Sequence, residues 1–232
     1  MRQMPLRVRV RDASRFSTFV AGRNEQAVER LADPARDGRC IWLWGRSGTG
    51  KTHLLQAACA EAGDRGDTAA YVDLAAEPTI EQLEGLETLM IVCLDGVDRV
   101  AASADWNAAI FRTHTLMQDA RSRLIVATLA APATLTFALS DLRSRLLAAE
   151  IFQLRELDDA GLLIALQLRA GQRGLELSDE GAEFLLRRLP RDMHTLCATL
   201  DQLDDASLAA QRKLTLPFLR EALADRIPAE GR

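Results

Sequence analysis

Short apolar runs alternate with amphipathic segments over the first two thirds of the chain. The runs at residues 40–44 and 123–128 are apolar at nearly every position, which is typical of parallel strands buried on both faces. Further strands are predicted at 69–74, 89–94 and 151–154, and helices at 24–32, 51–63, 79–86 and 106–120. Strands that alternate with helices predict an α/β fold in which helices cover both faces of a parallel sheet.

The pattern changes after residue 157, where helical periodicity continues without strand signals. Three or four amphipathic helices are predicted, at residues 158–173, 178–189, 192–211 and 217–224. Gly174 is placed to cap the first of them, and Ser178 to begin the second. The chain is therefore expected to have three parts. They are an N-terminal arm at residues 1–14, an α/β domain at 15–155 and a small all-helical domain at 156–232.

The composition is that of a soluble, cytoplasmic protein. Apolar residues make up 48% of the 232 positions, and neither a run of 18 apolar residues nor a signal-peptide core occurs. The four cysteines form no CxxC pair of the kind that indicates zinc. A net charge of -4 disfavours extensive contact with DNA phosphates. We expect neither a membrane partner nor sequence-specific DNA binding.

One segment matches the phosphate-binding pattern G-x-x-x-x-G-K-[ST] in full. It consists of Gly45, Arg46, Ser47, Gly48, Thr49, Gly50, Lys51 and Thr52. The glycines let backbone N–H groups converge on phosphate oxygens where the following helix begins. Lys51, one of only two lysines, would reach the β- and γ-phosphates, and the Thr52 hydroxyl would bind Mg²⁺. The segment predicts a nucleotide site.

Asp95 ends a buried strand about forty residues after this P-loop. A carboxylate in that place can hold Mg²⁺, directly or through water, opposite Thr52. An Asp after a strand is otherwise a turn or cap residue, and the P-loop favours the metal role.

These segments together resemble the AAA+ ATPases, and more narrowly the DnaA family and its Hda members, which inactivate DnaA. The DnaA-like segments are residues 16–24, 45–59, 94–98 and 141–146. The narrower likeness to Hda lies at residues 166–170, 199–204 and 210–215. The resemblance covers nearly the whole chain. It implies a P-loop AAA+ sheet followed by a helical lid, with bound ADP or ATP.

The resemblance also implies roles for single residues near the nucleotide. Phe19, Val20 and Ala21 match the family's adenine pocket. His53 directly follows the P-loop and is included in the site, with packing on the helix as the alternative. Arg145 matches the arginine finger that reaches the γ-phosphate of a neighbouring subunit, and Arg143 is the competing choice.

The N-terminal arm contains a short motif of its own. Gln3, Met4, Pro5 and Leu6 resemble the peptide with which Hda proteins bind the sliding clamp, the β subunit of DNA polymerase III. Apolar side chains of such a peptide enter a groove while the glutamine amide fixes its orientation. A disordered arm is the alternative.

Three departures from the AAA+ pattern concern hydrolysis. Gly96 replaces the glutamate that polarises water, which leaves Asp98 as a catalytic candidate. Thr128 is the side-chain candidate for the polar sensor after the next strand. His194 occupies the position of the lid arginine, and Arg191 is a possible substitute one turn away. We expect tight nucleotide binding with slow intrinsic ATP hydrolysis.

The leading hypothesis is a regulator of replication initiation. Together with the DNA-loaded clamp, it would stimulate ATP hydrolysis by DnaA through Arg145 and so prevent re-initiation, with nucleotide-dependent self-association open. The alternative is an autonomous AAA+ ATPase, such as a helicase loader or a DnaA-like remodeller. Direct binding to origin DNA is disfavoured by the charge, and we expect no DnaA-type helix-turn-helix domain after the lid.

Overall fold

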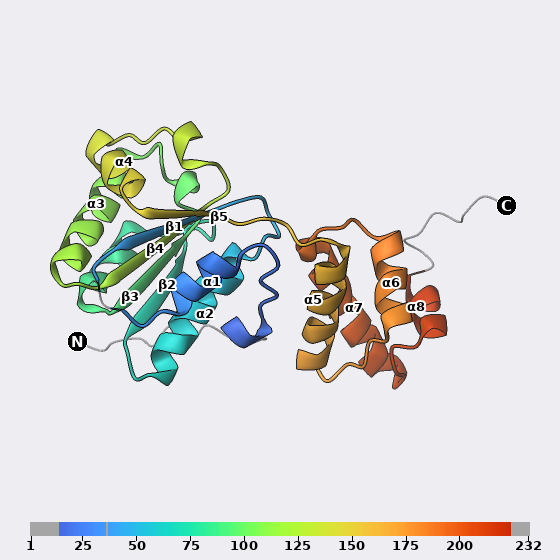
Figure 1. Cartoon of the computed structure of the whole chain (residues 1–232). Coiled ribbons are helices and arrows are strands. Elements are labelled where there is room, and N and C mark those ends of the chain that lie inside the picture. Colours follow the sequence, from blue (N-terminus) through green and yellow to red (C-terminus); the bar gives the residue numbers. More distant parts are fainter. Residues whose placement is uncertain (1–13, 36, 224–232) are drawn as a thin grey trace.

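The computed structural model describes residues 14–35 and 37–223, which form a parallel β-sheet between helices and a helical lid beside it (Figure 1). The strand order is β2-β3-β4-β1-β5, and every neighbouring pair is parallel. The strands are β1 (Cys40–Trp44), β2 (Ala69–Asp73), β3 (Ile91–Asp95), β4 (Arg123–Thr128) and β5 (Glu150–Gln153). The predicted fold class is confirmed.

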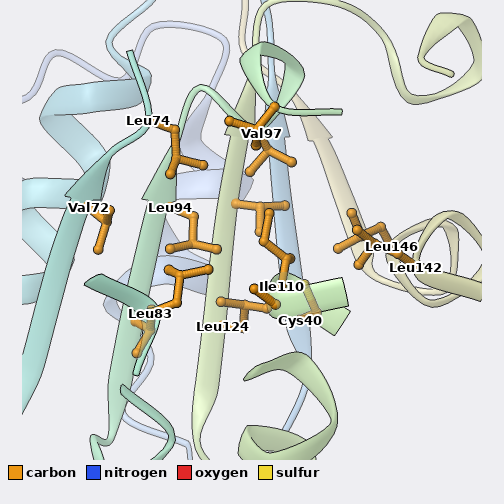
Figure 2. Close-up of a cluster of buried hydrophobic side chains, with 14 of the residues drawn as sticks. Cys40, Val72, Leu74, Leu83, Leu94, Val97, Ile110, Leu124, Leu142 and Leu146 are labelled. Atoms are coloured by element: carbon orange, nitrogen blue, oxygen red, sulfur yellow. The ribbon is translucent and has the colours of Figure 1, made fainter. Parts of the chain in front are cut away.

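Helices cover both faces of this sheet because its central strands are apolar and buried at nearly every position. On β1, Ile41 and Leu43 pack with the helices of one face, whereas Cys40 and Trp42 pack with those of the other. The first face carries α1 (Glu25–Ala32) and α2 (Lys51–Asp64), and the second carries α3 (Ala104–Asp119) and α4 (Ser140–Leu147). Figure 2 shows the second core, where Leu142 and Leu146 of α4 approach side chains of the sheet.

Two segments differ from the sequence-based expectation. The helix predicted at residues 79–86 is replaced by two 3-10 turns, Ile80–Leu83 and Leu86–Thr88. Gly85 separates them with a φ of 80°, which a continuing helix does not allow. Helix α4 was not predicted from periodicity, because only two of its eight residues, Leu142 and Leu146, are buried.

The lid has a hydrophobic core of its own. It consists of α5 (Asp159–Gln172), α6 (Asp179–Arg188), α7 (Met193–Ala210) and α8 (Leu216–Ala222). Asp158, Ser178 and Asp192 each accept a hydrogen bond from a first-turn backbone N–H and thereby fix where α5, α6 and α7 begin. Among the described residues, no helix is long and apolar enough to cross a membrane.

Candidate nucleotide site

A cavity of about 570 Å³ lies where the carboxyl edge of the sheet meets the lid. The carboxyl ends of β1, β3 and β4 point to this edge because the strands are parallel, and ligands of open α/β sheets bind at such an edge. The lid contributes residues of α5 and α7, so the cavity has walls from both parts of the chain.

The P-loop connects β1 to α2 through backbone that only glycine adopts easily. Gly50 has a φ of 90°, and a Cβ there would lie 2.4 Å from Cε2 of Phe19. A Cβ at Gly45 would lie 2.6 Å from the Leu154 carbonyl oxygen. Both glycines are therefore required for close packing of the loop against its neighbours.

Lys51 is held inside the loop that it completes. Its Nζ donates hydrogen bonds to the carbonyl oxygens of Gly45 at 2.7 Å and Arg46 at 2.8 Å. Burial lowers the pKa of Lys51, and the charges of Asp95 and Asp98 oppose this effect. Two hydrogen bonds within the protein thus hold the ammonium group of Lys51 against the loop. The Arg46 side chain points elsewhere, to Glu156.

The Thr52 hydroxyl and the Asp95 carboxylate lie together at the start of α2. Thr52 Oγ1 donates to Asp95 Oδ2 at 2.5 Å, and the Tyr71 hydroxyl donates to the same oxygen at 3.0 Å. Burial raises the pKa of Asp95, while these two hydrogen bonds lower it. Hydroxyl and carboxylate oxygens are the donors that Mg²⁺ takes beside nucleotide phosphates, so the pair fits this ion. The expected pairing of Thr52 with Asp95 is present in the structure.

The residue after Asp95 has a backbone unsuited to glutamate. Gly96 has φ 82° and ψ 36°, in the left-handed region. Asp98 lines the cavity two residues later, and its Oδ1 accepts a hydrogen bond from the Leu129 N–H at 3.2 Å. Asp98 is therefore within the cavity that holds Lys51, but one of its oxygens is occupied by the backbone of the next strand's loop.

Thr128 is committed to hydrogen bonds within the protein. Its hydroxyl accepts a hydrogen bond from Trp42 Nε1 at 2.8 Å and donates one to the Ala130 carbonyl oxygen at 2.9 Å. The side chain is fully buried, although the residue borders the cavity. A hydroxyl has a single proton, so Thr128 cannot donate to a phosphate in this arrangement.

Two of the three residues expected around adenine border this cavity. Phe19 and Val20 line the cavity, and Phe19 contacts His53 with 5.4 Å between ring centroids. Ala21 lies outside the cavity, in the turn before α1, where its carbonyl oxygen accepts from the Asn24 N–H. His53 Nε2 donates to the Arg15 carbonyl oxygen at 2.9 Å, and burial lowers the pKa of His53.

The lid approaches the P-loop through the first turn of α7. A Cβ at Gly48 would lie 3.4 Å from the Met193 backbone nitrogen, and both Met193 and His194 line the cavity. Arg191 lies outside the cavity, because its guanidinium pairs with Asp159 on α5 at 2.9 Å. The expected substitution of Arg191 for the lid arginine is not supported by this geometry.

Several cavity residues were not anticipated from the sequence, among them Tyr71, Asp73 and Arg169. Tyr71 and Asp73 lie on β2, which carries no motif, and Asp73 is in register with Asp95 of β3. Arg169 of α5 lines the lid side, and its charge lowers the pKa of His53 further. The parallel pairing of β2 with β3 could have indicated the first two, whereas Arg169 carried no signal beyond its Hda-like segment.

Arg145 lies on α4, outside the cavity of its own chain. Its Nη1 donates to Gln118 Oε1 at 3.1 Å, and its guanidinium is 6.0 Å from the Phe111 ring centroid. Both Arg145 and Arg143 are exposed. The clamp-peptide candidates Gln3, Met4, Pro5 and Leu6 lie outside the described residues.

Residues 10–151 match the model of the bacterial DnaA ATPase domain. The chain belongs to this DnaA ATPase family. Residues 158–223 match a second model, the lid domain of Hda. This member of the DnaA family therefore combines a DnaA-type ATPase domain with an Hda-type lid, which agrees with the resemblance drawn from the sequence.

Solved structures support the same fold. Domain III of the Thermotoga maritima replication initiation protein DnaA superimposes with a TM-score of 0.78 at 17% identity, covering 92% of this chain and 97% of that chain. DnaA from Aquifex aeolicus bound to AMPPCP gives 0.67 at 21% identity, covering 84% and 65%. The Thermotoga maritima RuvB Holliday junction branch migration motor gives 0.64 at 15% identity, covering 87% and 68%.

Proposed function

We propose that this DnaA-family chain is a nucleotide-bound regulator of replication initiation that stimulates ATP hydrolysis by DnaA in trans. The observation that carries the proposal is the position of Arg145. It is exposed on α4 and lies outside its own cavity, so its guanidinium is available to a nucleotide held by another subunit. An arginine supplied in trans raises the rate of phosphoryl transfer by about 10³–10⁵.

The cavity would hold ADP or ATP with Mg²⁺. The P-loop N–H groups and Lys51 would bind the phosphates, and Phe19 and Val20 would contact the base. Thr52 and Asp95 would hold the Mg²⁺ ion, which neutralises charge on the β- and γ-phosphates. The geometry of these groups supports the proposal, because the loop is closed around Lys51 and the two Mg²⁺ donors are hydrogen-bonded to each other.

Slow intrinsic hydrolysis follows from the groups on the γ-phosphate side. Gly96 supplies no carboxylate, one oxygen of Asp98 accepts a hydrogen bond from a backbone N–H, and the Thr128 hydroxyl already donates its hydrogen bond to the Ala130 carbonyl oxygen. The nucleotide then acts mainly as a structural ligand between the α/β domain, residues 15–155, and the lid, residues 156–232. In this view it sets the pose of the domains rather than driving repeated turnover.

The proposed partners are DnaA and the DNA-loaded sliding clamp, both in the cytoplasm. The clamp would bind the arm at residues 3–6, which follows from the family resemblance of that peptide. Self-association that depends on the nucleotide is a further proposal, since an exposed Arg145 can also meet a second copy of this chain.

The test follows phosphate release from DnaA-ATP in the presence of clamp loaded on DNA. Addition of this protein should raise the rate of phosphate release. Arg145→Ala should lower the stimulated rate by about 10³-fold or more. Arg143→Ala is the matched control, because Arg143 is also exposed on α4. Deletion of residues 1–6 should remove the effect of the clamp.

Two outcomes would contradict the proposal. Stimulation that survives Arg145→Ala but not Arg143→Ala would assign the finger to Arg143. Robust ATP turnover by the protein alone, insensitive to clamp and DnaA, would instead support an autonomous ATPase, for which the complete pair of Lys51 and Thr52 is the favourable observation.

A further inference from the structure

The chain's only tyrosine is hydrogen-bonded to the proposed metal ligand. Tyr71 lies on β2 opposite Cys93 of β3, two residues before the register pair formed by Asp73 and Asp95. Because side chains alternate along a strand, Tyr71 and Asp95 project from the face that α2 covers, and Thr52 lies in the first turn of that helix. The sheet register therefore brings the phenol to the carboxylate.

Both hydroxyl groups donate to the same carboxylate oxygen. Thr52 Oγ1 lies 2.5 Å from Asp95 Oδ2, and the Tyr71 hydroxyl lies 3.0 Å from it. Two donors on one oxygen oppose rotation of the carboxylate, which keeps Asp95 in place to accept the hydrogen bond from Thr52. With its proton committed to Asp95, the Thr52 hydroxyl has only lone pairs left for other partners, and a cation binds to lone pairs.

We propose that Tyr71 is a positioning residue of the Mg²⁺ site, which acts on the ion through Asp95 and Thr52. This inference rests on the nucleotide and Mg²⁺ binding proposed above, but not on the action of Arg145 on DnaA. Groups that orient metal ligands typically contribute about 10–100-fold to metal affinity. Tyr71 is also partly buried against α2, so a packing role must be separated from the role of its hydroxyl.

Tyr71→Phe separates the two roles, because it removes the oxygen and retains the ring. Binding of a fluorescent ADP analogue is measured in EDTA and during a Mg²⁺ titration. In Tyr71→Phe, the Mg²⁺ concentration at half effect should rise about tenfold or more, while affinity in EDTA stays at the parent value. Thr52→Val should remove the Mg²⁺ effect.

Thr113→Val is the matched control. It deletes another buried hydroxyl, which donates to the Ala109 carbonyl oxygen within α3, and it should leave the Mg²⁺ midpoint unchanged. A parent-like midpoint in Tyr71→Phe, beside a loss in Thr52→Val, would overturn the inference. An equal loss of affinity by Tyr71→Phe in EDTA would also overturn it, because that result indicates a packing role. So would binding of the ADP analogue to the parent protein that does not depend on Mg²⁺. The inference stands, and the DnaA proposal fails, if the midpoint shifts but DnaA-ATP hydrolysis is not stimulated.

Discussion

At the scale of single residues, two arginines of the lid lie in different surroundings, one in the cavity and one at the surface. Arg169 lines the cavity beside His53, whereas Arg191 pairs with Asp159 at the surface. Arg169→Ala should weaken ADP binding by about tenfold or more, because hydrogen bonds from a charged donor are worth about 1.5–3 kcal/mol. Arg191→Ala should leave the affinity unchanged. Titration with a fluorescent ADP analogue measures both.

The same two variants can also contradict the prediction that Arg169 contacts the nucleotide. A loss of affinity in Arg191→Ala that exceeds the loss in Arg169→Ala would instead favour Arg191, the substitute for the lid arginine named from the sequence. An exposed ion pair such as that of Arg191, whose side chain is 60% exposed, contributes about 0–1 kcal/mol to stability, so Arg191→Ala should remain folded.

A second residue-scale prediction concerns the missing carboxylate. Gly96→Glu restores the usual AAA+ side chain, but ATP turnover should remain as slow as in the parent. The backbone at Gly96 is left-handed, and the Thr128 hydroxyl still donates its hydrogen bond to the Ala130 carbonyl oxygen rather than to a phosphate. The strain should lower the free energy of unfolding by about 1–2 kcal/mol. Phosphate release and urea denaturation measure the two effects.

Gly66→Glu is the control for strain alone. Gly66 has a φ of 80° and open space around it, in the turn between α2 and β2. It should show a similar loss of stability and unchanged turnover. Fast hydrolysis by Gly96→Glu would mean that the carboxylate alone was missing, and that Thr128 is no obstacle.

The sequence predicted the residues that have a fixed spacing and missed those that only the fold brings together. Lys51 and Thr52 follow from one contiguous motif, and Asp95 from the end of a buried strand. Tyr71 and Arg169 reach the same cavity from β2 and α5, and nothing in their local sequence indicates this. The commitment of Thr128 depends on Trp42 of the adjacent strand, a contact set by register.

At the scale of elements, one arginine of α1 forms a bidentate ion pair with a glutamate of the edge strand β5. Arg30 donates from Nε to Glu150 Oε2 at 2.7 Å and from Nη2 to Glu150 Oε1 at 3.0 Å, and its side chain is 15% exposed. Arg30→Gln should lower the free energy of unfolding at pH 7 by about 1–2 kcal/mol. Urea denaturation over a pH series measures it.

The pH dependence has a definite sign. Hydrogen bonds from Arg30, and more weakly from Arg39, hold the pKa of Glu150 below its ordinary value. The stabilisation is therefore present above the ordinary glutamate pKa of about 4.3 and is lost as the pH falls through the folded-state pKa. The difference between Arg30→Gln and the parent should shrink in acid. Arg187→Gln, whose side chain is 71% exposed beside Glu183, should cost less than about 0.5 kcal/mol at any pH.

Elements were predictable where burial repeats along the segment. The strands with continuous apolar runs and the four lid helices all occur close to their expected bounds. The helix predicted at residues 79–86 does not form because a left-handed glycine interrupts it. Helix α4 was missed because it buries only two side chains. Periodicity needs several buried turns to be visible, and these segments do not supply them.

At the scale of the whole molecule, the sheet and the lid have separate cores, and the cavity lies between them. The sheet packs through two apolar clusters, one on each face, whereas the lid packs through a third. The cavity is lined by Lys51 and Phe19 on one side and by Arg169 and Met193 on the other. A ligand bound there contacts both parts, so its binding free energy should stabilise both at once.

This gives a prediction for the two lysines. At a concentration of 100 times its dissociation constant, ADP with Mg²⁺ should stabilise the fold by about 2.7 kcal/mol, which is a rise in the melting temperature of about 5–10 °C. Hydrogen exchange should slow in the P-loop and in the first turn of α7 together. Lys51→Ala should abolish both effects. Lys213→Ala should retain them, because Lys213 pairs with Glu176 on the lid surface with its side chain 79% exposed. Protection confined to the α/β domain would show that the nucleotide does not join the lid to the sheet, and the lid's part in the proposed function would then fail.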